Sequence, residues 1–356
     1  MGARPVPGSG RMYSGMTQQP ASPRPAPTSA DVARHAGVSR ATVSYVLNDS
    51  ASGRVSEQTR QRVRAAAEEL GYVPHAAARS LRAGHTGIVL LTMPDAVFGP
   101  LFTSFLGELR GALRALGYPI VIYVDPGGPD ADVAVGWAEL RPTAVLAGLG
   151  SGLTERGVAL LRRSGTRAVF TIGGQPVPGA HALTLDQHGI GTAAAEHLLA
   201  RGHRRIGAVV PSDPTLDFFS RPRLEGLLAA CAEHGGPDTL VQPLSLGYNE
   251  QDAAELASRW RELDLSAVFT YNDEYALLLL SALQDAGLRV PEDVALVGAD
   301  DILLARLTRP RLTTVRLELP DGARLAELID RLIRNQDAAT ESHALGSSYL
   351  VVRDSG

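Results

Sequence analysis

The spacing of apolar residues changes near residue 87 of this chain. Before that point, apolar positions recur every three to four residues in three short segments, the period of amphipathic helices. Beyond it, short apolar runs rich in Val, Ile and Ala alternate with longer amphipathic segments. That alternation is typical of strands followed by helices in an α/β domain. The pattern therefore predicts a small all-helical unit followed by a large α/β unit.

Local signals place the ends of the short helices. Thr28 and Asp31 have capping-box spacing at the start of the first helix. Gly37 suits a sharp turn because glycine tolerates a positive φ. Ser39 and Ser56 are natural N-caps for the two helices that follow. The first two helices thus flank a tight turn, as in a helix-turn-helix unit.

The second helix, predicted from Arg40 to Leu47, divides into two faces. We expect Val38, Val43 and Leu47 to point inward at helical spacing. The residues expected to face outward are Arg40, Ala41, Ser44 and Tyr45. A polar outer face after a tight turn is what a reader of the DNA major groove requires. Pro74 then suits the start of a short helix over 75–82, too short to be stable by itself.

In the larger unit we predict two similar lobes with parallel, doubly wound sheets, and a ligand at the carboxyl ends of the strands. The expected strands are 88–92, 120–124, 144–147, 168–172, 206–210, 267–270 and 295–297. The expected helices are 101–116, 130–139, 154–164, 189–201, 221–234, 250–262, 274–286 and 320–335.

Charge and composition narrow the class of protein. The net charge of −4 excludes a uniformly basic nucleic-acid coat, yet residues 28–86 hold eight Arg against five acidic residues. Such an imbalance steers only one end of the chain toward DNA. The single cysteine, Cys231, indicates a reducing compartment, the cytoplasm. No apolar run approaches the ~18 residues of a membrane span. Residues 1–27 contain six prolines and are expected to be a disordered tail.

Motifs of catalysis are absent from the sequence. It contains no GxSxG, no P-loop and no His or Cys cluster with metal-ligand spacing. The run GLGSG at 148–152 follows a strand, but its glycines do not have dinucleotide-binding spacing. We therefore expect no catalytic residues, no metal and no cofactor. A DNA reader joined to a ligand-sized domain indicates a switch rather than an enzyme.

Several motifs resemble the lactose-repressor/galactose-repressor family of bacterial transcription factors. They are AGVSRATVSYVLN, VSEQTRQRV, EELGYVPHAAARSLR, AAAEHLLARGHRRIG, RPRLEGL, the run from AVFTYNDEY to ALVGADDI, and RPRLTTVR. The resemblance spans residues 28 to about 354. It implies a helix-turn-helix domain at 28–73, a hinge helix or linker at 74–84, and a two-lobed periplasmic-binding-protein-like domain at 85–356.

The resemblance also implies how the chain divides between the two lobes. The N-terminal lobe is expected to hold about 85–187 and 318–340, and the C-terminal lobe about 188–316 and 345–354.

The resemblance assigns a set of residues to DNA. Arg40, Ala41 and Tyr45 fall where side chains read base edges, although many members carry Arg or His in place of Tyr45. The hinge helix is expected to fold on the operator, where Leu81 would insert between base pairs as a wedge. The other residues assigned to DNA are Ser39, Thr42, Ser44, Asn48, Ser56, Thr59, His75 and Ala78.

For the effector, the resemblance implies a polar pocket with aromatic walls. The residues assigned to it are Phe102, Asp186, Arg223, Tyr248, Asn272, Asp273 and Asp300. Carboxylates, a guanidinium and aromatic faces suit a polyhydroxylated ring, and they suit a purine nearly as well. The sequence IGGQP at 172–176 lacks the acidic residue common there in relatives, so the identity of the effector is not transferred.

The sequence thus predicts a cytoplasmic, homodimeric transcriptional regulator, a repressor, with no membrane contact. It would bind a pseudo-palindromic DNA operator under the control of a small effector, expected to be a sugar or sugar derivative. The alternative within this class is a repressor that needs a purine-type corepressor. A solute-binding protein and an α/β enzyme are the two remaining classes. Tight sugar binding without DNA binding would favour the first, and turnover of a bound ligand the second.

Overall fold

The computed structural model describes residues 26–47, 55–73, 86–94, 99–125, 133–148, 150–173, 176–336 and 339–356. Its internal contacts divide the chain into two compact units, Met1–Ala78 and Arg79–Gly356, which we describe separately. The predicted hinge helix and its residues His75, Ala78 and Leu81 lie outside the described residues, as does Asn48. Within the described residues, no helix has the length and apolar character needed to cross a bilayer.

The first unit contains three helices, α1 (Ser29–Ala36), α2 (Arg40–Leu47) and α3 (Glu57–Glu69). The predicted capping box is confirmed, since Thr28 and Asp31 satisfy each other's backbone N–H groups. Gly37 takes φ 66° and ends α1, which makes the expected turn. The Oγ atoms of Ser39 and Ser56 accept the N–H groups of Thr42 and Thr59, so both predicted N-caps form.

The core of this unit is small and consists of Val and Ala. Val32, Val43 and Val63 from the three helices are almost fully buried. On α2, Val46 is buried as well, whereas Leu47 is only partly buried. The inward face predicted for α2 is therefore rotated toward Val46, because residues 43 and 46 both face α1 and α3 at i, i+3 spacing.

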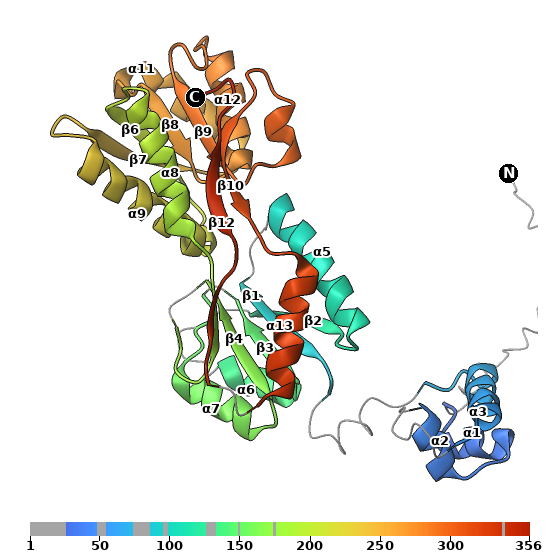
Figure 1. Cartoon of the computed structure of the whole chain (residues 1–356). Coiled ribbons are helices and arrows are strands. Elements are labelled where there is room, and N and C mark those ends of the chain that lie inside the picture. Colours follow the sequence, from blue (N-terminus) through green and yellow to red (C-terminus); the bar gives the residue numbers. More distant parts are fainter. Residues whose placement is uncertain are drawn as a thin grey trace, which may run out of the picture. The chain divides into compact units, whose positions relative to one another are not determined.

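The second unit contains two six-stranded sheets (Figure 1). The first sheet has the strand order β11-β5-β4-β3-β1-β2 and the second has the order β12-β10-β9-β8-β6-β7. All pairs are parallel except β10 with β12. The strands of the first sheet are β1 (Val89–Pro94), β2 (Ile120–Asp125), β3 (Ala144–Ala147), β4 (Ala168–Ile172), β5 (His181–Thr184) and β11 (Ser342–Ala344). Those of the second are β6 (Arg205–Pro211), β7 (Leu240–Leu246), β8 (Ala267–Thr270), β9 (Ala295–Ala299), β10 (Thr313–Glu318) and β12 (Ser347–Val351).

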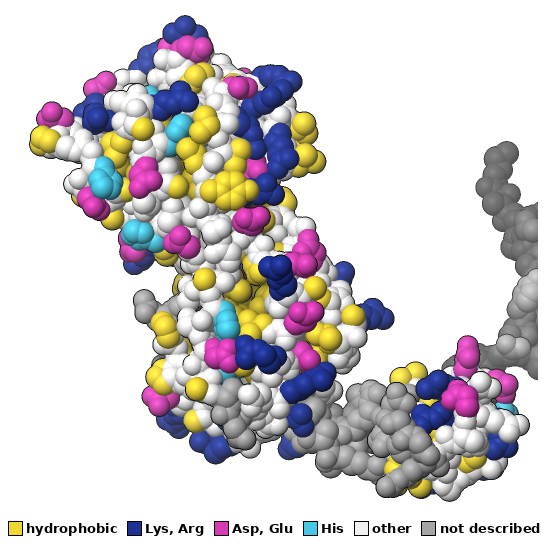
Figure 2. All heavy atoms as spheres, viewed as in Figure 1, with side chains coloured by type: hydrophobic (Ala, Val, Ile, Leu, Met, Phe, Trp, Pro, Cys, Tyr) yellow, Lys and Arg dark blue, Asp and Glu magenta, His cyan; other side chains and the backbone are white. Residues whose placement is uncertain are grey.

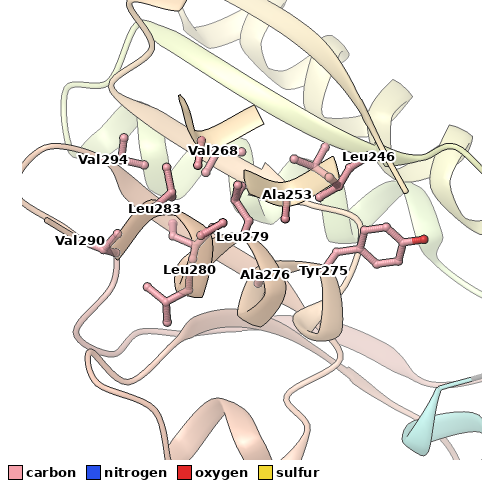
Figure 3. Close-up of a cluster of buried hydrophobic side chains, with 14 of the residues drawn as sticks. Leu246, Ala253, Val268, Tyr275, Ala276, Leu279, Leu280, Leu283, Val290 and Val294 are labelled. Carbon is pink, nitrogen blue, oxygen red and sulfur yellow. The ribbon is translucent and has the colours of Figure 1, made fainter. Parts of the chain in front are cut away.

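Helices cover both faces of each sheet. In the N-terminal lobe, α5 (Pro100–Ala115) and α13 (Gly322–Arg334) pack on one face, and α6 (Val133–Glu139) and α7 (Glu155–Arg163) on the other. In the C-terminal lobe, α8 (Gln187–Ala200) and α9 (Asp217–His234) cover one face. The opposite face carries α10 (Glu250–Ser258), α11 (Trp260–Leu263) and α12 (Asp273–Asp285), and Figure 3 shows their apolar core. This arrangement is the predicted doubly wound one.

The chain crosses between the lobes three times, from β5 to α8, from β10 to α13 and from β11 to β12 (Figure 1). The N-terminal lobe is therefore completed by α13 and β11, which come late in the sequence. On the face shown in Figure 2, acidic and basic side chains are interspersed over both lobes, and basic ones gather along one edge of the C-terminal lobe.

Some elements differ from the prediction. The strands β5, β7, β10, β11 and β12 were not predicted from the apolar runs. β7 contains Pro243, which argues against a central strand, but β7 lies at the edge of its sheet, where proline is tolerated. The helix expected over 130–139 is described from Val133, and the one expected over 250–262 is divided into α10 and α11 at Arg259.

Candidate functional site

A cavity of about 330 Å³ lies in the second unit, where the strands of the C-terminal lobe end. Its walls come from the segments that follow β6, β7, β8 and β9, and from α9 and α12. The N-terminal lobe contributes the first residues of α5, including Leu101 and Phe102. A cavity at the carboxyl ends of parallel strands, closed from a second lobe, is a typical ligand site.

Arg223 of α9 is the buried anchor of this cavity, with only 4% of its side chain exposed. Its Nε donates to Gln187 Oε1 at 2.7 Å, and its Nη1 donates to the carbonyl oxygen of Tyr271. Its Nη2 donates to Asp300 Oδ1 at 3.0 Å. The guanidinium also lies 5.1 Å from the centre of the Tyr271 ring, a cation–π distance. Arg223 thus ties together three chain segments around the cavity.

The approach of α9 that places Arg223 depends on two glycines. A Cβ on Gly191 of α8 would lie 1.8 Å from the carbonyl oxygen of Arg223. A Cβ on Gly226 of α9 would lie 2.0 Å from the carbonyl oxygen of His188. The two helices therefore cross with backbone against backbone, which only glycine permits.

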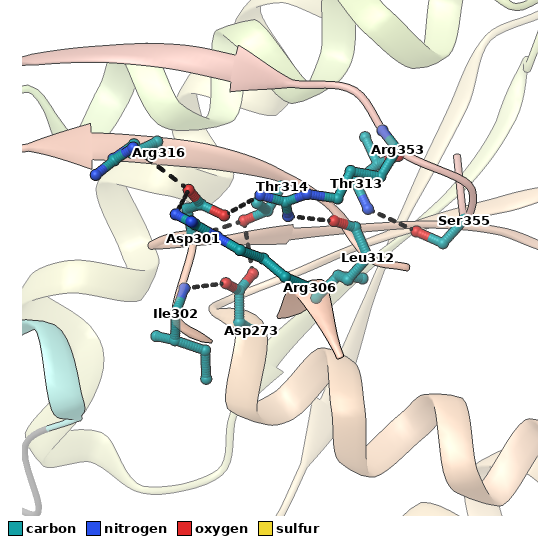
Figure 4. A network of polar contacts seen from close by, with 10 residues as sticks. All are labelled: Asp273, Asp301, Ile302, Arg306, Leu312, Thr313, Thr314, Arg316, Arg353 and Ser355. Atoms are coloured by element: carbon teal, nitrogen blue, oxygen red, sulfur yellow. Dashed lines mark hydrogen bonds and ion pairs between the residues drawn. The ribbon is translucent and has the colours of Figure 1, made fainter. Parts of the chain in front are cut away.

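Asp300 follows β9 in a conformation that a non-glycine residue rarely takes, with φ 97°, and Asp301 has φ 50°. The carboxylate of Asp301 is almost fully buried and accepts from Arg306 and Arg353, with Arg316 at 3.6 Å (Figure 4). These three arginines hold the loop in its strained form. The surrounding structure therefore fixes the position from which Asp300 faces the cavity.

Asp273 supports the same loop through two hydrogen bonds (Figure 4). Its Oδ1 accepts from Thr314 Oγ1 at 2.6 Å and its Oδ2 from the backbone N–H of Ile302 at 2.9 Å. Burial raises the pKa of Asp273 to about 8, and the nearby carboxylates of Asp300 and Asp301 act in the same direction. Asp273 is therefore a buried structural residue and is not among those that line the cavity.

The cavity wall next to Tyr271 is aromatic and acidic. The rings of Tyr248 and Tyr275 lie 5.2 Å apart, and Tyr275 meets Tyr271 edge-to-face at 5.6 Å. The Tyr275 ring packs at the edge of the C-terminal core with its hydroxyl turned away from the labelled aliphatic side chains (Figure 3). Burial raises the pKa of Tyr275 to about 12, with Asp213 and Glu274 adding to the effect. Burial, followed by the charge of Asp300, likewise raises the pKa of Glu274.

The structure brings together most of the predicted effector residues. Phe102, Arg223, Tyr248, Asn272 and Asp300 line one cavity, although they come from five separate parts of the sequence. Asp186 and Asp273 are not among its lining residues. Asp186 instead caps α8, accepting the N–H of Gly189 at 2.8 Å.

Sequence reasoning missed several lining residues. They are Gln187, Asp213, Phe219, Tyr271, Glu274 and Tyr275. Most of them lie within three residues of a strand end or a predicted site residue, so the strand-end rule could have found them.

On the helix-turn-helix side, the exposed face of α2 is close to the expected one. Arg40, Ala41 and Tyr45 are exposed, and Thr42 and Ser44 are half-buried. Ser39 and Ser56 cap the first turns of α2 and α3, where they accept the N–H groups of Thr42 and Thr59. Thr59 lies beside Ser56, with their hydroxyl oxygens 2.9 Å apart.

Comparison with known proteins gives two family matches. Residues 28–75 match the model of bacterial regulatory proteins, lacI family, and residues 195–356 match that of the periplasmic binding protein-like domain. The HTH-type transcriptional regulator GntR of Pseudomonas aeruginosa is 31% identical over 338 residues, covering 92% of this chain and 95% of the relative. The regulator CelR of Thermobifida fusca is 32% identical over 342 residues, covering 93% of this chain and 98% of the relative.

Solved structures give the same picture. The complex of the regulator CelR with cellobiose has a TM-score of 0.61 at 28% identity, and covers 93% of this chain and all of that one. A lac repressor dimer bound to operator and the anti-inducer ONPF has a TM-score of 0.73 at 22% identity, with 92% and 98% of the two chains covered. At that identity the second comparison supports the fold alone.

Proposed function

The chain belongs to the lacI family of bacterial regulatory proteins, and we propose that it is a homodimeric repressor whose operator binding is controlled by a carbohydrate effector. Family membership makes it a DNA-binding transcriptional regulator rather than an enzyme. The operator, the effector and the dimer are our proposals. The main observation in support of an effector is the cavity between the two lobes, with a buried Arg223–Asp300 pair and several aromatic side chains in its walls.

The cavity has the chemistry of a site for a polyhydroxylated ring. Tyrosine and phenylalanine faces pack against the apolar faces of such a ring, while amide and carboxylate groups accept and donate at its edge. Asn272 and Gln187 supply the amides and Asp300 the carboxylate. The solved structure of CelR contains cellobiose, which is consistent with a sugar effector.

We propose that α2 binds in the major groove. Arg40 is exposed at the first position of that helix, where its guanidinium can pair with two acceptors of a guanine. Tyr45, 43% exposed one turn further on, would contact a neighbouring base. Ser39 and Ser56, with Thr42, Ser44 and Thr59, would hold phosphates. The hinge residues His75, Ala78 and Leu81 would contact the minor groove of the operator, as the family resemblance implies.

The domain limits follow as part of this proposal, with the DNA-binding domain at 28–73, the hinge at 74–84 and the effector domain at 85–356. An operator on the chromosome places the protein in the cytoplasm. Because Phe102 and Arg223 reach the effector from different lobes, binding would favour one arrangement of the lobes. An effector that changes operator affinity must itself bind free and DNA-bound protein with different affinities.

The first test is selection of bound duplexes from a random DNA pool. We expect enrichment of a palindrome with a fixed central step, and Arg40→Ala should relax the preference at one base pair per half-site by about 1–3 kcal/mol. Arg34→Ala is the matched control, since Arg34 is 77% exposed on α1 and its ion pair among the described residues is with Asp31. Enrichment of motifs without symmetry would contradict the proposal that a homodimer binds the operator.

The effector is then sought with sugars and purines in separate pools on the selected operator. PurR of Photobacterium profundum is 30% identical over 290 residues, so a purine response is the alternative outcome.

A further inference from the structure

The walls of the cavity carry more negative than positive charge. Three lining residues are acidic, Asp213, Glu274 and Asp300, while Arg223 is the one basic residue among the lining residues described. Asp300 is neutralised by Arg223 across 3.0 Å. Among the described residues, no Arg or His lies within ion-pair distance of Glu274. An uncompensated carboxylate therefore faces the cavity.

Arg223 forms its described ion pair with Asp300 and not with Glu274. Three of its five N–H groups donate to Gln187, to the carbonyl oxygen of Tyr271 and to Asp300. The hydrogen bond described for the Glu274 carboxylate comes from Asn272 Nδ2 at 3.4 Å, which is long for this pair of groups. A carboxylate offers about four acceptor positions, so most of the acceptor capacity of Glu274 remains for a ligand.

Burial makes this unpaired carboxylate energetically costly. Glu274 is only partly exposed, and burial together with the charge of Asp300 raises its pKa. A half-buried charge without a partner is unfavourable, and an arriving cation would remove the cost. The carboxylate of Glu274 therefore favours a ligand that brings positive charge.

The aromatic side chains beside Glu274 favour the same ligand. Tyr248 and Tyr275, with ring centres 5.2 Å apart, both lie close enough to Glu274 for its charge to affect their pKa values. The faces of tyrosine rings attract ammonium groups. The Tyr271 ring is not counted among these, because it already lies against the guanidinium of Arg223. A carboxylate close to tyrosine rings suits the binding of an ammonium group.

We propose that the effector is a carbohydrate that carries a protonated amine, an amino sugar, and that Glu274 binds its ammonium group. The ring hydroxyls would meet the side chains of Asn272, Gln187 and Asp300, which line the same cavity. Glu274 is thus the residue that sets specificity for amino over neutral sugars. This inference rests on the carbohydrate effector proposed above.

The test compares sugars that differ only at the amine. Glucose with glucosamine, galactose with galactosamine, and cellobiose with its diamino counterpart are titrated into the full-length protein by calorimetry. We expect the amino member of at least one pair to bind tenfold tighter or more, which corresponds to about 1.4 kcal/mol. Glu274→Gln, which keeps the size of the side chain and removes its charge, should abolish that preference. Glu255→Gln on the exposed face of α10 is the matched control and should keep it.

A second measurement needs no variant. N-acetylglucosamine has the same ring as glucosamine but an uncharged nitrogen, so it should bind to the wild-type protein no more tightly than glucose. Neutral sugars that bind as tightly as their amino partners would overturn the amino-sugar inference and leave the carbohydrate effector standing. If neither series binds, the carbohydrate effector fails as well. An amino preference that survives Glu274→Gln would remove Glu274 from the role proposed here.

Discussion

Replacement of Arg223 by alanine should separate effector response from operator binding. The substitution leaves Asp300 without its cation, and it leaves Gln187 Oε1 and the carbonyl oxygen of Tyr271 without their donor. Breaking a buried ion pair by removing one partner costs about 3–5 kcal/mol, and each buried acceptor left unpaired costs about 1–3 kcal/mol.

These costs do not add, because the groups share one network and water from the cavity can enter the vacated space. We expect a loss of about 3 kcal/mol in the free energy of unfolding of the effector domain. A domain of ordinary stability, about 5–15 kcal/mol, remains folded after that loss.

Urea unfolding followed by circular dichroism measures the stability, and fluorescence anisotropy on the selected operator measures binding with and without effector. Arg221→Ala is the matched control on the same helix. Arg221 is 69% exposed and pairs with Asp217 at 3.4 Å, so its removal should change stability by less than about 0.5 kcal/mol and leave the response intact.

Two results would refute this reasoning. An Arg223→Ala variant as stable as the wild type would show that the buried network contributes nothing. A variant that still responds to effector would remove Arg223 from the site.

Three further changes test other parts of the structure. Gly191→Ala places a methyl group 1.8 Å from the carbonyl oxygen of Arg223, so calorimetry should find the effector domain destabilised by about 3 kcal/mol or more. Gly111→Ala, in an open position of α5, should instead be neutral or stabilising by up to about 1 kcal/mol. Thr28→Ala removes the capping box of α1 and should lower the thermal stability of the isolated first helical unit, followed by circular dichroism, by about 1 kcal/mol.

The pKa of Asp273 is raised to about 8 from 3.8, so the native state keeps a proton that the unfolded chain loses. Stability should therefore fall as the pH rises from about 4 through 8. The difference between the urea midpoints at pH 5 and pH 9 should be smaller in Asp273→Asn than in the wild type, because asparagine does not titrate.

The sequence predicts elements more readily than it predicts contacts. The helix starts at Thr28 and Ser56 could be predicted because their capping interactions are local. The contact of Arg223 with Asp300 joins residues 77 positions apart, and no local pattern encodes it. Asn272 and Asp273 were both assigned to the ligand, yet Asp273 faces away from the cavity. Neighbouring residues at a helix start point about 100° apart, and packing against Thr314 decides which one faces the ligand.

The buried carboxylate of Asp301 connects the base of the cavity to the segments that join the lobes. Arg316 lies on β10 and Arg353 lies two residues after the end of β12, and both pair with Asp301. β10 leads into one interlobe connection and β12 follows another. A ligand that pulls on the neighbouring Asp300 therefore acts on a loop fastened to two of the three crossings. Because the loop is strained and one of its arginine partners, Arg316, lies on β10, we expect a change in the loop to be passed to the crossing strands. We therefore expect an effector at Asp300 to act on the arrangement of the lobes as well as to fill the cavity.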